Sequence, residues 1–301
     1  MDYIQSSLNY TGGKYKLLPQ ILPNFPEDIH TFVDLFCGGC SVGLNVNAEH
    51  VILNDIEPHL ISLLKAIRFV NSRCGEEIDS IILRYRLSES TKHSYEYYGC
   101  DGSKGLASYN KEAFMKLRDD FNAMDIDTPY KWIMLYTLIV YGFNNQIRFN
   151  SKGEYNISVG KRDFNSRMRS KLESFVSRLN SVNPEICNKD FREFGISNLT
   201  KDDLIYADPP YLLSCATYNE LGGWTEKDEK DLYVYLDGLN SRGVRFALSN
   251  VLRSKGGENS SLIEWSKKYK VIPLNFNYNN SSYHLKDKDS LNEEVLIVNY
   301  D

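Results

Sequence analysis

The sequence predicts an α/β fold in which a Rossmann-like sheet is interrupted by a mostly helical insertion that carries a β-hairpin. Three short apolar runs, at residues 31–36, 51–55 and 204–207, have the length and composition of buried strands. Between the second and the third run, four segments with helical periodicity follow one another without a strand signal. The predicted strands therefore lie on both sides of a helical region, as in a domain with an insertion.

The chain has 301 residues, of which 42% are apolar, enough for one large domain or two modest ones. No signal peptide is evident, and the longest apolar run, Trp132–Phe143, is too short to span a bilayer. We therefore expect a soluble, intracellular protein without a membrane segment. The formal net charge of −5 argues against a general nucleic-acid coat but leaves room for a local basic surface.

The cysteines do not indicate a metal or redox site. Cys37 and Cys40 have the spacing of a zinc-ligand pair, but no second pair completes a set of four ligands. Both lie in a glycine-containing turn, so we interpret them as small buried residues and expect no metal.

The first predicted strand, the turn Cys37–Cys40 and the segment Ser41–Leu44 have the order strand, glycine loop, helix of a nucleotide-binding unit. Glycines let the backbone approach a ligand closely. Asp34, near the end of this strand, could receive a ligand ammonium group. Asp55 ends the second strand about 20 residues further on, where such folds place the acid that binds ribose hydroxyls.

Near the N-terminus, Gly12 and Gly13 precede Lys14 and an apolar segment, Lys16–Leu22, that is predicted to be helical. This arrangement indicates a turn that brings Lys14 toward an anion at a helix start. The spacing of a Walker motif is absent. The alternative is a surface turn with a solvated lysine.

The tetrapeptide Asp208-Pro209-Pro210-Tyr211 follows the third buried strand. The two prolines fix φ and lack backbone donors, so the turn is stiff and its carbonyl groups can accept hydrogen bonds from another molecule. Asp208 adds an acceptor and Tyr211 adds a flat aromatic face. Together they could hold a planar group with an amino substituent, such as a nucleobase. The alternative is an ordinary turn that ends a strand.

The inserted region is predicted to contain helices at residues 59–72, 76–87, 111–124 and 129–143, with Thr128 as the cap of the last one. Two alternating runs, 144–150 and 155–160, flank a Lys-Gly turn and predict a β-hairpin. From residue 148 to residue 171 the chain has seven basic and two acidic residues. This composition is typical of a phosphate-contacting element, although a solvated basic face would look the same.

The rest of the chain returns to the α/β pattern. Residues 186–191 are predicted to form a third sheet edge, where Asp190 and Phe191 could bind the amino group and the face of an adenine. The remaining predicted elements are helices at 167–182, 225–239 and 261–269, a strand at 244–249, and a closing antiparallel pair at 271–276 and 294–300. Thr225 and Asp228 have the spacing of a capping box at the start of the second of these helices.

With these motifs in order, the chain resembles the Dam-type family of DNA adenine-N6 methyltransferases, in the alpha group that carries the Asp-Pro-Pro-Tyr motif. The resemblance covers essentially the whole length. It rests on six motifs: residues 9–14, the loop Phe36-x-Gly38, Asn54-Asp55, the hairpin residues 148–160, Asp190-Phe191, and Asp208–Tyr211. It implies a methyltransferase catalytic domain at residues 1–58 and 165–301, and an inserted target-recognition domain at residues 59–164.

The resemblance implies S-adenosylmethionine as the methyl donor. The residues that it assigns to donor binding are Tyr10, Lys14, Asp34, Phe36, Gly38, Gly39, Asp55, Asp190, Phe191 and Asp208. It implies that the catalytic residues Asp208, Pro209, Pro210 and Tyr211 hold a target adenine flipped out of duplex DNA. Asp208 and the Pro209 carbonyl would accept from its amino group, and Tyr211 would stack on its ring.

The residues that the resemblance assigns to DNA contacts are Asn144, Gln146, Arg148, Asn150, Ser158 and Lys161. Three of them depart from the pattern of GATC-specific members, in which a leucine, a proline and an arginine stand at positions 146, 158 and 161. Base specificity resides in such side chains, so we do not predict GATC. Cys40 also departs from the family, which usually has glycine there.

Other functions remain open from the sequence. The same pocket could serve amino methylation of cytosine or of RNA, although the cytosine relatives favour serine before the two prolines. The chain could be a catalytically inactive DNA-binding relative, or a nicotinamide dehydrogenase, which lacks a role for the Pro-Pro turn. We expect double-stranded DNA as the partner, with a cognate restriction endonuclease as a further candidate. We expect a monomer or weak dimer, in the cytoplasm of a bacterial, archaeal or virus-infected cell.

Overall fold

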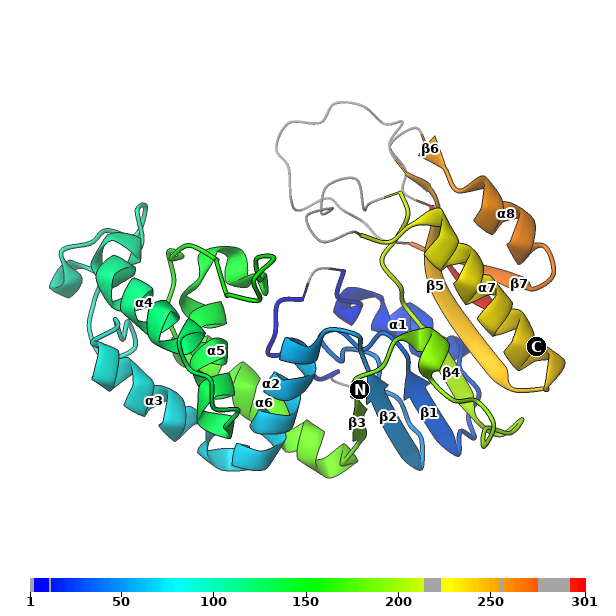
Figure 1. Cartoon of the computed structure of the whole chain (residues 1–301), viewed down its shortest axis with the longest axis horizontal. Coiled ribbons are helices and arrows are strands. Elements are labelled where there is room, and N and C mark those ends of the chain that lie inside the picture. Colours follow the sequence, from blue (N-terminus) through cyan, green and yellow to red (C-terminus); the bar gives the residue numbers. More distant parts are fainter. Residues whose placement is uncertain (1–2, 11, 214–222, 255–256, 276–292) are drawn as a thin grey trace. The chain divides into compact units, whose positions relative to one another are not determined.

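The computed structural model describes residues 3–10, 12–213, 223–254, 257–275 and 293–301 (Figure 1). Thr11, in the motif at residues 9–14, and Phe276, at the end of the predicted strand 271–276, lie outside the described residues. A mixed α/β architecture is present, with a central, mostly parallel sheet and flanking helices, consistent with the Rossmann-like fold predicted from the sequence.

The sheet has the strand order β3-β2-β1-β4-β5-β8-β7, and β6 pairs with β5 outside this path. The pairs β1–β2, β1–β4 and β4–β5 are parallel, whereas β8 runs antiparallel to both β5 and β7. The strands are β1 Thr31–Asp34, β2 His50–Asn54, β3 Glu185–Cys187, β4 Leu204–Ala207, β5 Arg245–Ser254, β6 Gly257–Glu258, β7 Lys270–Leu274 and β8 Glu293–Val298.

The register of the central strands brings the predicted acids to one edge of the sheet. Asp34 on β1 pairs with Leu53 on β2 and with Tyr206 on β4. Asp55 follows β2 directly, and Asp208 follows β4 directly. All three carboxyl groups therefore lie at the carboxyl ends of parallel strands, which is where open α/β folds bind ligands.

Both faces of the sheet are covered by apolar packing. On one face, α7 (Glu226–Ser241) and α8 (Ser260–Ser266) pack on strand residues that include Ile205 and Phe246. On the other face, the ring of Phe25 packs on the rings of Phe32 and Tyr206, with 5.7 Å between the ring centroids in each pair. The capping box predicted at Thr225 and Asp228 is present at the start of α7.

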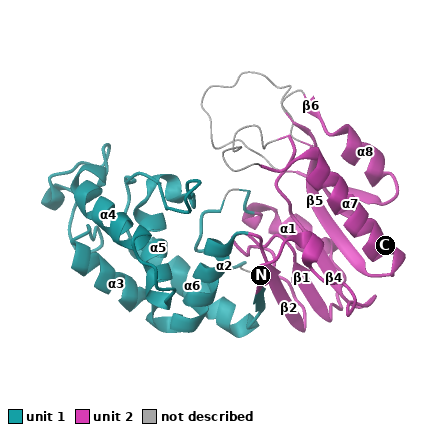
Figure 2. Ribbon diagram, viewed as in Figure 1, with its two compact units in different colours: residues 1–13, 57–186 teal, residues 14–56, 187–301 magenta. Residues whose placement is uncertain are grey.

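The chain forms two compact units (Figure 2). Unit 1 comprises Met1–Gly13 and Glu57–Ile186, and unit 2 comprises Lys14–Ile56 and Cys187–Asp301. The sequence-based division at 59–164 differs, because it assigned residues 165–186 to the sheet. In the structure α6 (Ser166–Val182) contacts two other helices of unit 1, α2 and α3, which explains its place there. The functional meaning of the division stays a prediction.

Unit 1 is helical. Its helices are α2 Pro58–Val70, α3 Cys74–Tyr85, α4 Ala107–Asn122, α5 Pro129–Tyr141 and α6 Ser166–Val182. Every residue of α5 from Ile133 to Tyr141 is buried, and α5 contacts α2, α3 and α4, so it is the central helix of this unit. The Thr128 side chain caps α5 as predicted. Of the helices formed by described residues, none has both the length and the apolar character needed to cross a membrane.

The predicted hairpin lacks regular strands. It forms isolated bridges, Phe149 with Tyr155 and Gly142 with Val159, around a turn. The side chain of Asn122, on α4, accepts from the Tyr155 N–H at 2.9 Å and donates to the Tyr155 carbonyl at 3.1 Å. The hairpin's own backbone bonds are made by the flanking residues, from the Asn150 N–H to the Glu154 carbonyl and from the Asn156 N–H to the Arg148 carbonyl. The amide of Asn122 therefore pairs with the outward-facing backbone groups of Tyr155 and ties the hairpin to α4.

Two predicted helices are shorter than expected. Ser41–Leu44 is a turn rather than a helix, although the Leu44 N–H donates to the Cys40 carbonyl at 3.1 Å. In the segment Lys16–Leu22, only α1 (Leu18–Ile21) is α-helical, with short 3-10 turns on both sides. Pro23 has no backbone N–H to continue that helix.

Candidate functional site

Asp34 and Asp55 hold the glycine loop from two strands. Asp34 Oδ2 accepts from the Gly43 N–H at 3.0 Å, and Asp55 Oδ2 accepts from the Gly38 N–H at 2.9 Å. Both carboxyl groups are buried. At Gly43 a side chain would collide with Asp34 and with Leu53, so glycine is required for this close approach.

Burial raises the pKa of Asp34 to about 8. The hydrogen bond from Gly43 lowers it, and the nearby charges of Asp208 and Asp55 raise it further. A neutral carboxyl group with such a pKa ionises readily when a cation arrives, because the cation removes the penalty of a buried lone charge. Asp34 is therefore suited to bind an ammonium group.

The glycine loop contains two residues in the left-handed backbone region, Gly38 at a φ of 46° and Cys40 at 61°. This conformation favours glycine, which gives a physical reason for the glycine that the resemblance leads one to expect at position 40. The Cys40 thiol donates to the Gly38 carbonyl at 3.6 Å. Cys37 and Cys40 are both buried, as the sequence predicted.

The loop after β3 is tied to the end of β2 by side-chain amides that the sequence analysis did not assign. The Asn54 side chain donates to the carbonyl groups of Leu35 and Lys189, both at 3.0 Å, and accepts from the Lys189 N–H at 3.1 Å. The Asn188 side chain donates to the Asp55 carbonyl at 2.8 Å. These bonds fix the position of Asp55. For Asn54, the sequence signals were its position at a strand end and its place in the motif Asn54-Asp55.

Three aromatic side chains form a cluster beside this loop. The ring centroids of Phe36, Phe191 and Trp224 lie 5.5 to 5.8 Å from one another. Phe191 is 4% exposed, and the Arg192 guanidinium lies 4.4 Å from its ring centroid. Phe191, which was predicted to contact the face of an adenine, is thus largely enclosed by protein. Trp224 was missed because it lies in a segment without a motif.

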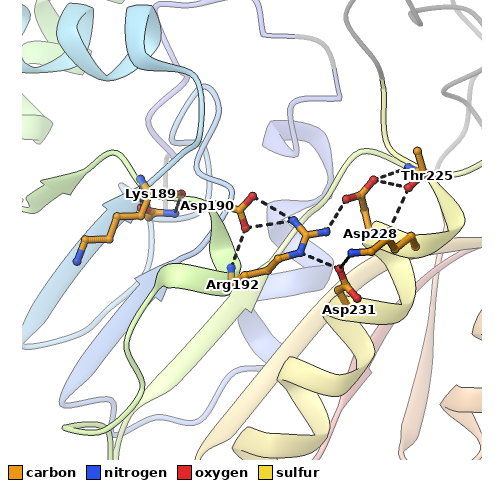
Figure 3. Close-up of polar contacts among 8 residues, drawn as sticks. Lys189, Asp190, Arg192, Thr225, Asp228 and Asp231 are labelled. Carbon is orange, nitrogen blue, oxygen red and sulfur yellow. Dashed lines mark hydrogen bonds and ion pairs between the residues drawn. The ribbon is translucent and has the colours of Figure 1, made fainter.

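Asp190 belongs to an ion-pair network on the same edge (Figure 3). Its carboxylate accepts from the Arg192 backbone N–H at 2.9 Å and pairs with the Arg192 guanidinium at 3.0 Å. Arg192 also pairs with Asp228 and with Asp231, both on α7. Since a carboxylate has about four acceptor positions, these bonds leave room for a further donor on Asp190.

Lys14, Asp208, Tyr211 and Glu294 form a polar cluster in which Lys14 and Glu294 are buried and Asp208 and Tyr211 are half-buried. The Lys14 ammonium lies 2.9 Å from Asp208 Oδ2 and 3.6 Å from Glu294 Oε1. The Tyr211 hydroxyl lies 3.0 Å from Asp208 Oδ1 and 3.1 Å from Glu294 Oε1. Lys14 also lies 5.0 Å from the centroid of the Tyr211 ring. Lys14 was predicted to lie beside an anion, and in the structure that anion is the Asp208 carboxylate. The hydroxyl of Tyr211, whose ring was predicted to stack on the base, is hydrogen-bonded to Asp208 and Glu294.

Burial is the largest influence on the acids of this cluster. It raises the pKa of Asp208, while Lys14 and the Tyr211 hydroxyl lower it. Burial likewise raises the pKa of Glu294, with Lys14 opposing and the charge of Asp208 adding to the rise. Pro209 is buried and Pro210 is exposed. Glu294 was missed, although an acid at the start of the apolar strand β8 is a sequence signal.

The remaining predicted residues belong to unit 1. They are Tyr10 and the predicted DNA-contacting residues Asn144, Gln146, Arg148, Asn150, Ser158 and Lys161. Asn144, Arg148, Ser158 and Lys161 are exposed, whereas Gln146 and Asn150 are half-buried. The predicted site residues therefore divide between the two units, with these seven in unit 1 and those of the sheet edge in unit 2.

Within the hairpin, two predicted DNA-contacting side chains also support the local structure. Arg148 Nε donates to the Asn156 side chain at 3.0 Å. The Asn150 side chain accepts from the N–H groups of Lys152 and Glu154, which closes the turn. The His59 ring, which the sequence analysis did not single out, stacks on Phe149 at 3.7 Å.

The sheet topology, the acids at its carboxyl edge, the glycine loop and the Asp-Pro-Pro-Tyr turn together define a Rossmann-like methyltransferase. A family model described as D12 class N6 adenine-specific DNA methyltransferase matches residues 10–280. The chain belongs to this family. The description of the family implies a methyl donor and a DNA substrate for its members.

Several characterised proteins are similar to the chain. Type II methyltransferase M.FokI of Planomicrobium okeanokoites is 41% identical over 305 residues, and Modification methylase StsI of Streptococcus sanguinis is 39% identical over 314 residues. Each match covers 99% of this chain and 43% of the relative, so the chain spans less than half of their length. DNA adenine methylase of Haemophilus influenzae is 30% identical over 205 residues, 68% of this chain and 63% of the relative.

Proposed function

We propose that this chain transfers a methyl group from S-adenosylmethionine to the exocyclic amino group of a flipped-out adenine in duplex DNA. The observation that carries the proposal is the Lys14–Asp208–Tyr211 arrangement at the sheet edge shared by Asp34 and Asp55. Acceptors for an amino group and an aromatic face are adjacent there. The same edge offers acids for the charged and hydroxyl groups of a donor.

The residues at the glycine loop fit S-adenosylmethionine. Asp34 is a buried acid whose raised pKa matches a partner with an ammonium group, and Asp55 could accept from ribose hydroxyls. Asp190 has room for the adenine amino group of the donor. Phe36 and Phe191 would contact its adenine, while Gly38 and Gly39 allow close approach. Tyr10 remains a candidate for closing over the donor. When bound, the sulfonium would supply an electrophilic methyl group and a neutral leaving group.

The Asp-Pro-Pro-Tyr turn would activate the target by orientation. The lone pair of the adenine amino group is delocalised into the ring, so it is a weak nucleophile. Hydrogen bonds from this group to Asp208 and to the Pro209 carbonyl would favour a pyramidal nitrogen and direct the lone pair toward the methyl group. Pro210 keeps the turn stiff, and Tyr211 would stack on the base. The bond from sulfur to the methyl carbon would break as the bond to nitrogen forms, and the methylated nitrogen would then lose one proton to solvent, so no covalent intermediate is required.

The exposed side chains of the hairpin would contact DNA. Arg148 and Gln146 are suited to base edges, and Lys161 to phosphate. The side chains at positions 146, 158 and 161 argue against GATC as the recognition sequence. The names of M.FokI and StsI support a role in restriction and modification, with a cognate endonuclease as partner. We further propose a monomer or weak dimer in the cytoplasm.

The test is expression in a host that lacks DNA methylation, followed by mapping of methylated bases across the genome. We expect N6-methyladenine at one short recognition sequence, and none when Asp208→Ala is expressed at the same level. Methylated cytosine would favour the cytosine alternative, and methylation confined to RNA would favour the RNA alternative. Expression of the folded protein without any methylated base would contradict the proposal.

A further inference from the structure

Glu294 is a buried acid in an apolar strand. It is the second residue of β8, and the four residues that follow it, Val295 to Val298, are buried as well. Only 7% of its side chain is exposed. A carboxylate in such surroundings is costly unless charged or polar groups compensate it, so its contacts indicate why it is there.

Glu294 shares its two partners with Asp208. Lys14 is 2.9 Å from Asp208 and 3.6 Å from Glu294, and the Tyr211 hydroxyl is 3.0 Å and 3.1 Å from the same two carboxyl groups. Tyrosine has a single hydroxyl proton and can donate it to one carboxylate at a time. The two acids therefore compete for the Tyr211 proton, and Lys14 lies closer to Asp208.

This competition matters for the target base. In the contacts described, Asp208 Oδ2 accepts from Lys14 and Oδ1 accepts from Tyr211. A carboxylate whose lone pairs are engaged by an ammonium group is a weaker acceptor for an incoming amino group. Moving Lys14 away from Asp208 breaks a close ion pair of a buried ammonium group, and Glu294 is a second carboxylate within 3.6 Å of the same ammonium group.

We propose that Glu294 is a positioning residue that takes over Lys14 and the Tyr211 hydroxyl when Asp208 turns to the target amino group. The inference rests on the proposed function, because it needs a target in contact with Asp208. Glu294 keeps both donors paired during the exchange and does not itself contact the base. The Tyr211 ring stays in place, since its hydroxyl remains hydrogen-bonded throughout.

Glu294→Gln is the informative variant, because it keeps the size and one acceptor oxygen and removes the charge. Glu293→Gln is the matched control. Glu293 is the preceding residue of the same strand, its side chain is 44% exposed, and it pairs with Arg253 at 2.7 Å. We expect Glu294→Gln to lower the single-turnover rate of methyl transfer at least tenfold and to leave the affinities for donor and DNA within about twofold. Glu293→Gln should behave as wild type.

The pH profile separates positioning from a structural role. Among the residues that the structure describes, the titratable and charged groups that face Glu294 are Lys14, Asp208 and Tyr211. Tyr206 and Asp34 lie within electrostatic reach of the cluster. Without the charge of Glu294, Lys14 stays on Asp208 and lowers its pKa. The acidic limb of the rate profile should therefore move to lower pH in Glu294→Gln. The maximal rate of this variant should also be lower than that of wild type. A structural defect would reduce the rate without moving this limb.

Glu294→Asp and a double variant complete the test. Glu294→Asp keeps the charge and should recover part of the rate lost in Glu294→Gln, which also covers the case that the glutamine variant does not fold. If Glu294 acts partly through the Tyr211 hydroxyl, the rate loss of Glu294→Gln combined with Tyr211→Phe should be smaller than the product of the single losses. If the rate loss of the double variant equals the product of the two single losses, Glu294 does not act through the Tyr211 hydroxyl, and that part of the inference is overturned.

The outcomes distinguish this inference from the proposed function. If wild type does not methylate adenine, the proposed function fails. If wild type methylates adenine and Glu294→Gln has the wild-type rate and pH profile, the inference is overturned and the proposed function stands.

Discussion

At the scale of single residues, the carboxyl groups of the sheet edge differ in their partners. Asp34 and Asp55 bind the backbone of the glycine loop, Asp190 binds Arg192, and Asp208 shares Lys14 and Tyr211 with Glu294. Each acid therefore has a distinct electrostatic environment. These differences lead to predictions that can be checked one residue at a time.

Asp34→Asn should stabilise the protein in a pH-dependent way. Burial raises the pKa of Asp34 from 3.8 to about 8, so the folded state retains a proton that the unfolded chain releases above about pH 4. Between these two pH values the unfolded state binds fewer protons than the folded state. Asp34 therefore makes its full contribution to stability below about pH 4, and this contribution is lost as the pH rises to about 8. Asparagine cannot ionise and still accepts from Gly43.

The measurement is the melting temperature of both proteins without donor at several values between about pH 5 and pH 8. The advantage of Asp34→Asn should grow across this range and level off above it. A difference that is the same at every pH would contradict the buried neutral carboxyl group.

Asp55→Ala should weaken binding of S-adenosylmethionine by at least about 1–3 kcal/mol, because ribose hydroxyls would lose a buried acceptor. The Gly38 N–H would lose its partner too, which adds to the effect. Calorimetric titration measures the affinity, with circular dichroism as the check on folding. Asp202→Ala, at an exposed acid of the same unit, is the control and should bind the donor as wild type does. Wild-type affinity in folded Asp55→Ala would exclude this donor contact.

The sequence predicted several site residues but could not predict their contacts. Asp34, Asp55 and Asp208 were found because each lies at or near the end of an apolar run, which is a local signal. Glu294 and Trp224 were missed, and Asn54 was named only as part of a motif, because their roles arise from contacts with distant parts of the chain. The stacking role predicted for Tyr211 likewise omitted its hydroxyl contacts.

At the scale of elements, the strands and the long helices were predictable, and the connections were less so. β1, β2 and β4 appear at the predicted positions because short apolar runs have few alternatives in an α/β chain. The helix predicted at Ser41–Leu44 and the strands of the hairpin were wrong. At the first place Cys40 has a φ of 61° and the following segment forms only turns, and at the second the pairing is limited to isolated bridges.

The hairpin gives a prediction for DNA recognition. Arg148→Ala should relax the preference at one base pair by about 1–3 kcal/mol, since a bidentate base contact would be lost. Lys161→Ala should weaken binding to all sequences alike and reduce the salt dependence by about one charge. Binding measured by fluorescence anisotropy at several salt concentrations, with matched and mismatched duplexes, separates the two effects.

Lys116→Ala is the control for these variants, because Lys116 is an exposed lysine on α4 outside the hairpin. It should leave both affinity and site choice unchanged. If neither Arg148→Ala nor Lys161→Ala affects binding or site choice, a different surface contacts the DNA.

At the scale of the whole molecule, chemistry and recognition have separate candidate locations. The carboxylates of the sheet edge belong to unit 2, whereas the predicted DNA-contacting side chains belong to unit 1. The chain carries a net charge of −5, yet residues 148–171 have seven basic and two acidic side chains. Such a local concentration suits a protein that contacts DNA over a limited surface.

The most direct test of the account is single-turnover methyl transfer to duplex DNA by Asp208→Ala, measured beside its melting curve. Asp208 is the acceptor proposed for the target amino group, and alanine has none. We expect a folded protein that binds donor and DNA but transfers no methyl group to adenine, while Asp208→Asn, which keeps an acceptor oxygen, retains some activity. An Asp208→Ala protein that methylates adenine at a rate near that of wild type would contradict the mechanism.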